Sequence, residues 1–154
     1  MGTLDHSSRK HAMLSASKAD RWLNCTPSAR LEEKAEETGK PSKYAEEGTL
    51  AHEMSECYLR ARFRITPVDV TSAELRKLKN SDLYTEAMDE PVMAYCQYVT
   101  EQYTGALRKT KDALILLEER LDFSAWVEQG FGTGDACIIA DGVMEIIDLK
   151  FGTG

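Results

Sequence analysis

The dipeptide Asp141-Gly142 constrains the fold of this chain more than any other local feature. It separates two apolar runs, GDACIIA and VMEIIDLKF. An Asp-Gly pair in this position is typical of a β-hairpin, because a type I′ turn needs positive φ at both central residues. With these two residues in the loop, counting outward along both strands pairs Asp135 with Asp148. The turn therefore predicts two carboxylates that face each other.

The repulsion between two opposed carboxylates has to be compensated by a positive charge. Directly opposed strand residues have Cβ atoms about 4.5 to 5.5 Å apart, and like charges there are destabilising. A divalent cation would compensate them. Lys150 lies two residues beyond Asp148 and so shares its face of the strand, whereas Leu149 points to the other face. Both faces are otherwise largely apolar, which indicates a strand that is covered on two sides.

This combination of charges suits phosphodiester hydrolysis. A hard cation held by two carboxylates would polarise a phosphoryl oxygen and lower the pKa of a water molecule, while Lys150 orients that water or stabilises the developing negative charge. A lone D-x-K on a strand is more often structural or merely exposed. The opposed Asp135 favours the functional interpretation.

The remaining patterns place helices before strands. We expect a flexible N-terminus at residues 1–12 and a single domain at 13–154, with a helical part at 13–111 and an antiparallel β meander at 113–151. The fold class is therefore α/β, and of the α+β type by chain order.

Capping residues mark the expected helices. Ser15 or Ser17 precedes the first helical pattern, and a second covers about 28–37. Ser42 can cap a longer helix, and Pro91 suits the first turn of the longest one, after a brief helix in SAELRKLK. The helix after Ser42 carries an apolar stripe made of Leu50, Met54, Cys57, Tyr58 and Ala61.

Charge and composition limit the class of protein. The 154 residues carry a formal charge of −7, which disfavours attraction of nucleic acid by the whole surface but not by a local site. No apolar run approaches the roughly 18 residues that span a bilayer, and the N-terminus lacks the apolar core of a signal peptide. We therefore expect an intracellular protein with no membrane partner. The widely spaced cysteines indicate buried thiols, not a zinc or disulfide framework; they are Cys25, Cys57, Cys96 and Cys137.

The hairpin region resembles the active-site signature of the PD-(D/E)XK nuclease superfamily, which reads G-x-x-D, a strand, then D-x-K. The matching segments are GTGD, ending at Asp135, and DLK, ending at Lys150. The upstream part is similar to the RecB-like branch, which has an S-x-S helix with a Cys-Pro element and a later helix with G-x-x-x-H. The chain offers LSASKADRWLNCTP and EEGTLAHEMSE, the latter with Gly48 and His52. The match covers about 14–62 and 113–151, and uncharacterised phage and prophage-associated members are similar in particular.

The resemblance implies a restriction-endonuclease-like core with a metal site. His52, Asp135 and Asp148 would bind Mg²⁺ or Mn²⁺, helped by the backbone carbonyl of Leu149, and Lys150 would be the catalytic lysine. An imidazole among hard oxygen ligands favours manganese somewhat. Without the resemblance, a single histidine on an amphipathic helix is more often a hydrogen-bonded structural residue.

Two further residues have more than one interpretation. Glu56 lies one helical turn after His52, where it could orient the imidazole, reach water at the metal, or be a solvated surface residue. Cys25 lies where some RecB-like nucleases place the first ligand of an iron–sulfur cluster. The other three cysteines are wrongly placed for such a cluster, so we expect none.

The resemblance implies a Mg²⁺- or Mn²⁺-dependent, exonuclease-like deoxyribonuclease. It would act on DNA ends or single-stranded tracts, alongside phage recombination proteins, in recombination, repair or replication in the bacterial cytoplasm. The family continues beyond D-x-K with a helix and a strand, whereas this chain ends four residues after Lys150. We therefore expect a truncated domain with an open, apolar edge strand, whose own activity is an open question. The alternative is a catalytically inactive nuclease-fold module that binds DNA or a protein partner.

Overall fold

The computed structural model describes residues 14–15, 18–34, 42–127 and 130–152. The expected flexible N-terminus at 1–12 therefore lies outside the described residues. The chain divides into two compact units. One comprises Met1–Lys40 and Arg120–Thr133, and the other comprises Pro41–Glu119 and Gly134–Gly154.

The first unit contains two short helices, α1 (Ala19–Asn24) and α2 (Ser28–Lys34), with the predicted break between them. The N-cap residue of α1 is Lys18, and it makes no side-chain cap hydrogen bond. Ser15 lies one turn upstream, where its carbonyl accepts hydrogen bonds from the Lys18 N–H (3.2 Å) and from the indole N–H of Trp22 (2.9 Å). The described α1 thus begins four residues after Ser15, and Ser17 lies outside the described residues. The predicted end of the second helix also falls outside them.

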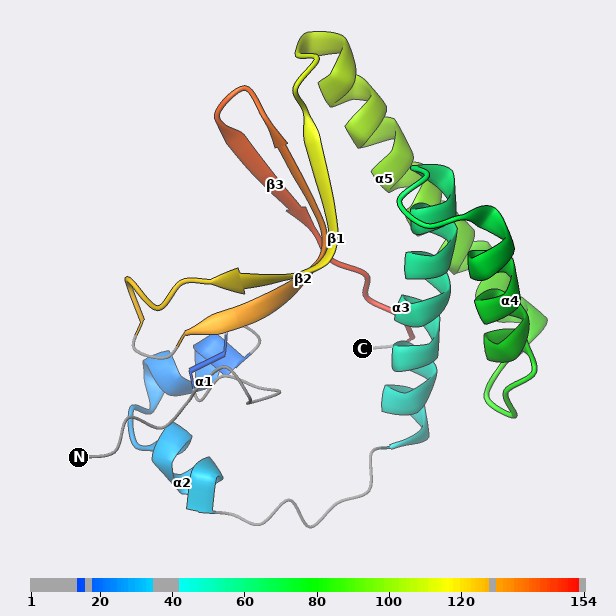
Figure 1. Cartoon of the computed structure of the whole chain (residues 1–154). Helices are drawn as coiled ribbons and strands as arrows, with labels where there is room; N and C mark the ends of the chain where they lie inside the picture. Colours follow the sequence, from blue (N-terminus) through cyan, green and yellow to red (C-terminus); the bar gives the residue numbers. More distant parts are fainter. Residues whose placement is uncertain (1–13, 16–17, 35–41, 128–129, 153–154) are drawn as a thin grey trace. The chain divides into compact units, whose positions relative to one another are not determined.

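The second unit is built around α3 (Lys43–Arg62), which packs against α4 (Val68–Lys79) and α5 (Asp89–Lys109) (Figure 1). Ser42 caps α3 as predicted, because its hydroxyl accepts a hydrogen bond from the Ala45 N–H at 3.3 Å. Of the expected apolar stripe, Leu50, Met54 and Cys57 are buried. The stripe therefore faces the interior of this unit.

Helix α4 is longer than its sequence pattern predicted, whereas the start of α5 agrees with its prediction. Helix α4 begins directly after Pro67 and has 12 residues, so the expected brief helix in SAELRKLK covers only its last eight. A single 3₁₀ turn, η3 (Glu86–Met88), leads into α5, and Pro91 lies in the first turn of α5 as predicted. Proline is tolerated there because its missing N–H has no helical acceptor in the first turn.

Three strands follow: β1 (Leu114–Asp122), β2 (Phe131–Ala140) and β3 (Val143–Ile147). They form one antiparallel sheet in the order β1-β2-β3. Asp141 and Gly142 have φ of 52° and 74°, so the positive φ expected of the hairpin turn is confirmed. The predicted register is also confirmed, with pairing from Ala140↔Val143 out to Ala136↔Ile147. The class is therefore α+β, as predicted.

Strand β3 differs from its prediction in length and burial. It ends at Ile147, so Asp148, Leu149 and Lys150 follow the strand as irregular chain. It is an edge strand, and Val143 and Ile146 expose 65% and 54% of their surface. The prediction that this strand is covered on two sides is therefore wrong. Among the described residues, the strand presents an exposed, apolar edge. Strand β2 takes the central position instead, with Ala136 and Cys137 fully buried.

The hydrophobic core of the second unit joins α3 and α5 to the sheet. Met54, Leu59, Val92 and Val99 are its largest fully buried aliphatic side chains, and each contributes roughly 1.5 to 3 kcal/mol relative to an exposed position. Leu149 extends this core beyond the end of β3. The remaining core members are Leu50, Ala51, Met88, Cys96, Ile115, Leu117, Ala136 and Ile138.

The burial of the cysteines and the absence of a membrane-spanning helix were both predicted from the sequence. Cys57, Cys96 and Cys137 are buried free thiols as predicted, but Cys25 is exposed, so the prediction for that residue is wrong. It follows α1 directly in a short unit with no buried residue in that helix, which leaves little interior to cover it. Over the described part of the chain, no helix is long and apolar enough to cross a membrane.

Candidate metal centre

Three side chains with metal-binding chemistry meet inside the second unit: His52, Glu118 and Asp135. They come from α3, β1 and β2, so segments far apart in the sequence are brought together by the packing of α3 on the sheet. One ligand atom from each residue lies within 4.8 Å of those of the other two. All three side chains are partly buried, with exposed fractions of 32%, 29% and 11%, respectively.

His52 and Asp135 form the closest pair of the three. Nδ1 of His52 lies 3.3 Å from Oδ2 of Asp135 and 4.0 Å from a carboxylate oxygen of Glu118. The hydrogen bond with Asp135 raises the pKa of His52 against the opposing effect of burial, and the carboxylate charges add to the increase. Without a cation, the imidazole therefore holds its proton more tightly than usual. A cation at this nitrogen competes with the proton, so binding should weaken as the pH falls.

Asp135 holds a second contact that ties the end of the hairpin to the centre. Its Oδ2 accepts a hydrogen bond from the backbone N–H of Leu149 at 2.7 Å. Burial alone would raise the pKa of Asp135, but the hydrogen bonds from His52 and Leu149 and the charges of His52 and Lys150 outweigh it and hold the pKa below its usual value. Asp135 is therefore an anion over the physiological range.

Glu118 is the member of the group that the sequence patterns did not single out. Burial raises its pKa to about 7, and the charges of Asp135 and Glu56 add to the increase, while His52 and Arg60 oppose it. Its backbone has φ of 50°, a left-handed conformation that costs a residue with a side chain on the order of 1 kcal/mol. Raised carboxyl pKa and backbone strain in one residue are typical of functional sites. The available signal was the pair Glu118-Glu119, which interrupts the apolar run of β1.

Asp148 and Lys150 lie next to this group but bind each other. Among the described residues, Asp148 is not a member of the three-residue group. Its Oδ2 lies 2.6 Å from Nζ of Lys150, and the side chains are 48% and 87% exposed. The charge of Asp148 still reaches His52, whose pKa it helps to raise. The predicted opposition of Asp135 and Asp148 falls one step beyond the paired residues, because β3 ends at Ile147.

The buried Leu149 orients this segment. Its side chain is 6% exposed and joins the core, so the flanking Asp148 and Lys150 are directed outward on a shared side. The contact that Leu149 makes with the centre is through its backbone N–H to Asp135. Tyr95 of α5 supports the same segment, because its hydroxyl donates a hydrogen bond of 3.3 Å to the carbonyl of Ile147.

Glu56 makes a different contact from the one considered for it. Its carboxylate accepts a hydrogen bond from Nε of Arg60 at 2.6 Å, one helical turn further along α3. It therefore orients Arg60 and not the imidazole of His52. Its negative charge nevertheless acts on the centre, since it contributes to the raised pKa of Glu118.

The donor set fits a hard divalent cation. Two carboxylates and one imidazole, in partly buried positions close enough to share an ion, are ligands that Mg²⁺ or Mn²⁺ accepts. Without an ion, Glu118 and Asp135 repel each other, as the raised pKa of Glu118 records. A divalent cation would relieve this repulsion. Acidic groups near a histidine also occur in proteins without metal, so the fit supports a site but identifies no particular ion.

Comparison with models of known protein families identifies a family for this chain. A family model matches residues 11–154, and this family is described as "Protein of unknown function (DUF2800)". No solved structure matches the chain. Since the description of the family assigns no activity, the function has to be argued from the residues of the centre.

Proposed function

We propose that this chain, which belongs to the family described as "Protein of unknown function (DUF2800)", is a metal-dependent deoxyribonuclease. The observation that carries the proposal is the convergence of His52, Glu118 and Asp135 from three separate elements. The hydrogen bond from Leu149 to Asp135 links this group to the D-x-K segment. A carboxylate-rich centre with a lysine beside it is chemically suited to phosphodiester hydrolysis.

The proposal gives each residue of the centre a role. His52, Glu118 and Asp135 would hold the cation, and Asp148 and the Leu149 carbonyl are further ligands that the sequence resemblance implies. A divalent cation held there supplies Lewis-acid polarisation of a phosphoryl oxygen. Mn²⁺ is favoured somewhat over Mg²⁺ by the imidazole.

Lys150 is the proposed catalytic lysine. Its hydrogen bond with Asp148 raises its pKa, so it remains a cation and is not a general base. An ammonium at this position can stabilise the negative charge that develops on the phosphate, or orient the attacking water by hydrogen bonding. Because its side chain is 87% exposed, it can reach a substrate without rearrangement of the core.

The order of motifs in the sequence supports a nuclease in particular. The order of a helix with G-x-x-x-H, a strand with G-x-x-D and then D-x-K resembles the RecB-like branch of the PD-(D/E)XK superfamily, and we propose a restriction-endonuclease-like core on that ground. The same resemblance suggests DNA ends or single-stranded tracts as substrates and a role in phage recombination, repair or replication. The open edge of β3 is compatible with a core that has further elements.

One observation favours a second candidate, a nuclease-fold module that binds DNA or a protein without cleaving. Asp148 is engaged by Lys150 and is outside the group of three that could share an ion. A site that kept this arrangement would bind metal through His52, Glu118 and Asp135 but lack a free catalytic lysine. The formal charge of −7 would then favour a protein partner.

Cleavage of labelled DNA in Mn²⁺ tests the proposal. We expect the wild-type chain to degrade a linear single strand, and Asp135→Asn and Lys150→Ala to lower kcat by roughly 100-fold or more. Asp82→Asn and Lys111→Ala are matched controls, because they remove the same charges from exposed positions outside the centre. A covalently closed duplex substrate tests the requirement for ends.

Calorimetric titration with Mn²⁺ separates the two candidates. Saturable binding that is lost in His52→Ala, without cleavage by the wild type, would favour the inactive module. Absence of both saturable binding and cleavage would refute the metal centre. Cleavage that survives in Asp135→Asn and Lys150→Ala would refute the assignment of the catalytic residues.

A further inference from the structure

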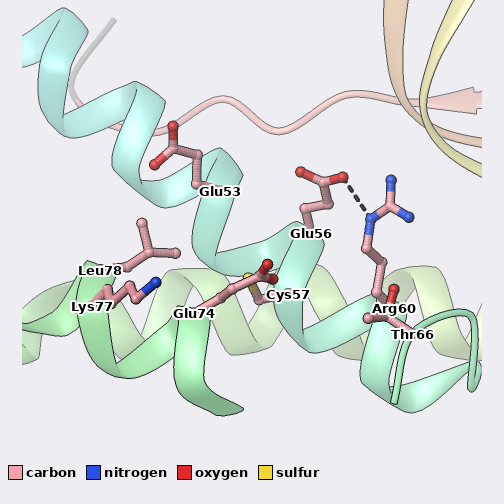
Figure 2. Close-up of a pocket in the computed structure, with 8 residues that line it drawn as sticks. All are labelled: Glu53, Glu56, Cys57, Arg60, Thr66, Glu74, Lys77 and Leu78. Atoms are coloured by element: carbon pink, nitrogen blue, oxygen red, sulfur yellow. Dashed lines mark hydrogen bonds and ion pairs between the residues drawn. The ribbon is translucent and has the colours of Figure 1, made fainter. Parts of the chain in front are cut away.

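A pocket of about 450 Å³ lies between α3 and α4, and residues of the helix that carries His52 line one side of it. Figure 2 shows its lining side chains, with Arg60 and Thr66 together at one end. Glu56 and Arg60 line the same pocket, and they follow His52 of the metal centre at intervals of four residues on α3. Side chains at this spacing lie along one face of a helix. The pocket therefore adjoins the centre through the face of α3 that bears Glu56 and Arg60.

Glu56 holds Arg60 in a defined orientation. Nε of Arg60 donates to Oε1 of Glu56 at 2.6 Å, and both side chains are about one-third exposed, at 34% and 28%. Figure 2 shows Nε of Arg60 joined to Glu56, and the guanidinium carries two further, terminal nitrogens. In the part of the chain that the structure describes, these nitrogens have no hydrogen-bond partner. The guanidinium thus offers a pre-oriented pair of donors to something outside the protein.

The metal centre carries several negative charges, which makes a nearby cation such as Arg60 important for attracting an anionic ligand. Glu118, Asp135 and Asp148 are acidic, and a nucleic-acid strand is repelled by such a group even when one divalent cation is present. Lys150 is engaged with Asp148. Arg60 lies eight residues after His52 on α3, so the two side chains lie two turns apart on one face of the helix. It is therefore a cation positioned to attract a strand to this side of the centre.

We infer that Arg60 binds a backbone phosphate of the substrate strand beside the metal centre, and that Glu56 is the residue that positions it. The inference rests on the proposed function and deepens it by naming a substrate-binding residue. A guanidinium with two parallel N–H donors matches the oxygens of a phosphodiester, which an ammonium contacts only as a point charge. Glu53 and Glu74, which also line the pocket, would repel the strand and limit the contact to the Arg60 end.

Binding of a labelled single-stranded oligonucleotide, with Ca²⁺ in place of Mn²⁺ to limit cleavage, tests the inference by fluorescence anisotropy. We expect Arg60→Ala to weaken binding roughly tenfold, as for loss of a charge-assisted hydrogen bond. Loss of one phosphate contact should also reduce the slope of log K against log salt by about 0.7. Arg60→Lys should keep the slope and bind with intermediate affinity. Arg62→Ala is the matched control, because this arginine lies on the same helix but lines the groove towards α5.

Glu56→Gln tests the positioning role. It should weaken binding less than Arg60→Ala and leave the salt slope in place, and the double variant should bind no worse than Arg60→Ala alone. In cleavage with Mn²⁺, Arg60→Ala should raise KM with little change in kcat, since a phosphate contact acts on bound substrate and transition state alike. A purely structural ion pair would shift the unfolding midpoint in both variants and leave the salt slope unchanged.

The outcomes separate this inference from the proposed function. If the wild-type chain cleaves DNA but Arg60→Ala matches Arg62→Ala in affinity and salt slope, the inference is wrong and the nuclease proposal stands. If the wild type binds in an Arg60-dependent manner but does not cleave, the inference holds and the catalytic proposal is wrong. If it neither binds nor cleaves, both are wrong.

Discussion

Replacing Glu118 by glutamine should make the metal-free protein more stable and the metal-bound protein less so. The change keeps the size of the side chain and removes its charge. Burial, together with the charges of Asp135 and Glu56, raises the pKa of Glu118 from 4.5 to about 7. Above that pH the folded chain has to hold a carboxylate that is disfavoured there, whereas glutamine stays neutral.

The magnitude follows from the pKa. A folded-state pKa raised above the unfolded value contributes stability that is fully present below about pH 4.5 and is lost as the pH rises through about 7. The full difference corresponds to at most ~3 kcal/mol. Because the Glu118 side chain is 29% exposed, solvent screening reduces this, and we expect Glu118→Gln to gain about 1 to 2 kcal/mol at about pH 8. At about pH 5 the gain should be close to zero.

Urea denaturation with EDTA, at about pH 5 and about pH 8, measures this gain. Glu119→Gln is the matched control, since Glu119 is the exposed neighbour of Glu118 on β1. The charge of Glu118 contributes to the raised pKa of His52, so Glu118→Gln also removes that contribution. This loss opposes part of the gain where His52 is protonated. A gain equal at both pH values, or a loss at about pH 8, would refute the electrostatic reasoning.

Adding Mn²⁺ should reverse the order of stability. A ligand that binds only the folded state at about 100 times its Kd stabilises it by ~2.7 kcal/mol. The wild type should gain this increment and Glu118→Gln should gain markedly less, because one of its three donors is a weaker ligand. Equal stabilisation of the two chains by Mn²⁺ would show that Glu118 does not bind the ion.

Two further predictions concern the surroundings of the centre. A Cβ at Gly48 or at Gly105 meets nothing within 4 Å. Gly48→Ala and Gly105→Ala should therefore each stabilise the protein by about 1 kcal/mol in urea denaturation. Only Gly48→Ala should also lower DNA cleavage if a substrate approaches α3 at this turn. Tyr95→Phe removes the hydrogen bond to the Ile147 carbonyl and should lower the free energy of unfolding by about 1 kcal/mol. It should also lower the rate of DNA cleavage, because the D-x-K segment that follows Ile147 becomes less ordered. An unchanged urea midpoint in Tyr95→Phe would contradict that role for the hydroxyl.

The register of the hairpin was predictable from sequence because it depends on one local feature. Asp141-Gly142 favours a two-residue turn, and each further pair then follows by counting. The end of β3 was not predictable in this way. The carboxylate of Asp135 takes the N–H of Leu149, and a side-chain acceptor that competes with the strand ladder leaves no trace in the alternation of residues.

The candidate centre was predictable only in part, for a related reason. His52 and Asp135 could be named from sequence spacing and resemblance, and the packing of α3 on β2 brings them together. Glu118 could not be paired with them, because its position depends on how β1 lies against β2 and on a left-handed backbone conformation in mid-strand. Neither is encoded in a short motif.

Capping predictions show the same limit on a smaller scale. Ser42 caps α3, where its hydroxyl accepts a hydrogen bond from the Ala45 N–H. Ser15 was an equally good candidate by type, but the backbone around it forms a turn with Lys18 and holds the indole of Trp22. Residue type predicts that a cap can form, while the neighbouring chain decides which residue forms it.

The hydrogen bond between Leu149 and Asp135 makes one backbone amide a reporter on the centre. The same oxygen, Oδ2, receives the Leu149 N–H and lies against His52, so any ion that withdraws electron density from this carboxylate weakens the bond to the amide. The amide proton of Leu149 should therefore shift in NMR spectra and exchange faster with solvent when the centre is filled. Occupancy of the metal centre could then be followed through this single amide, even in a variant that turns over no substrate.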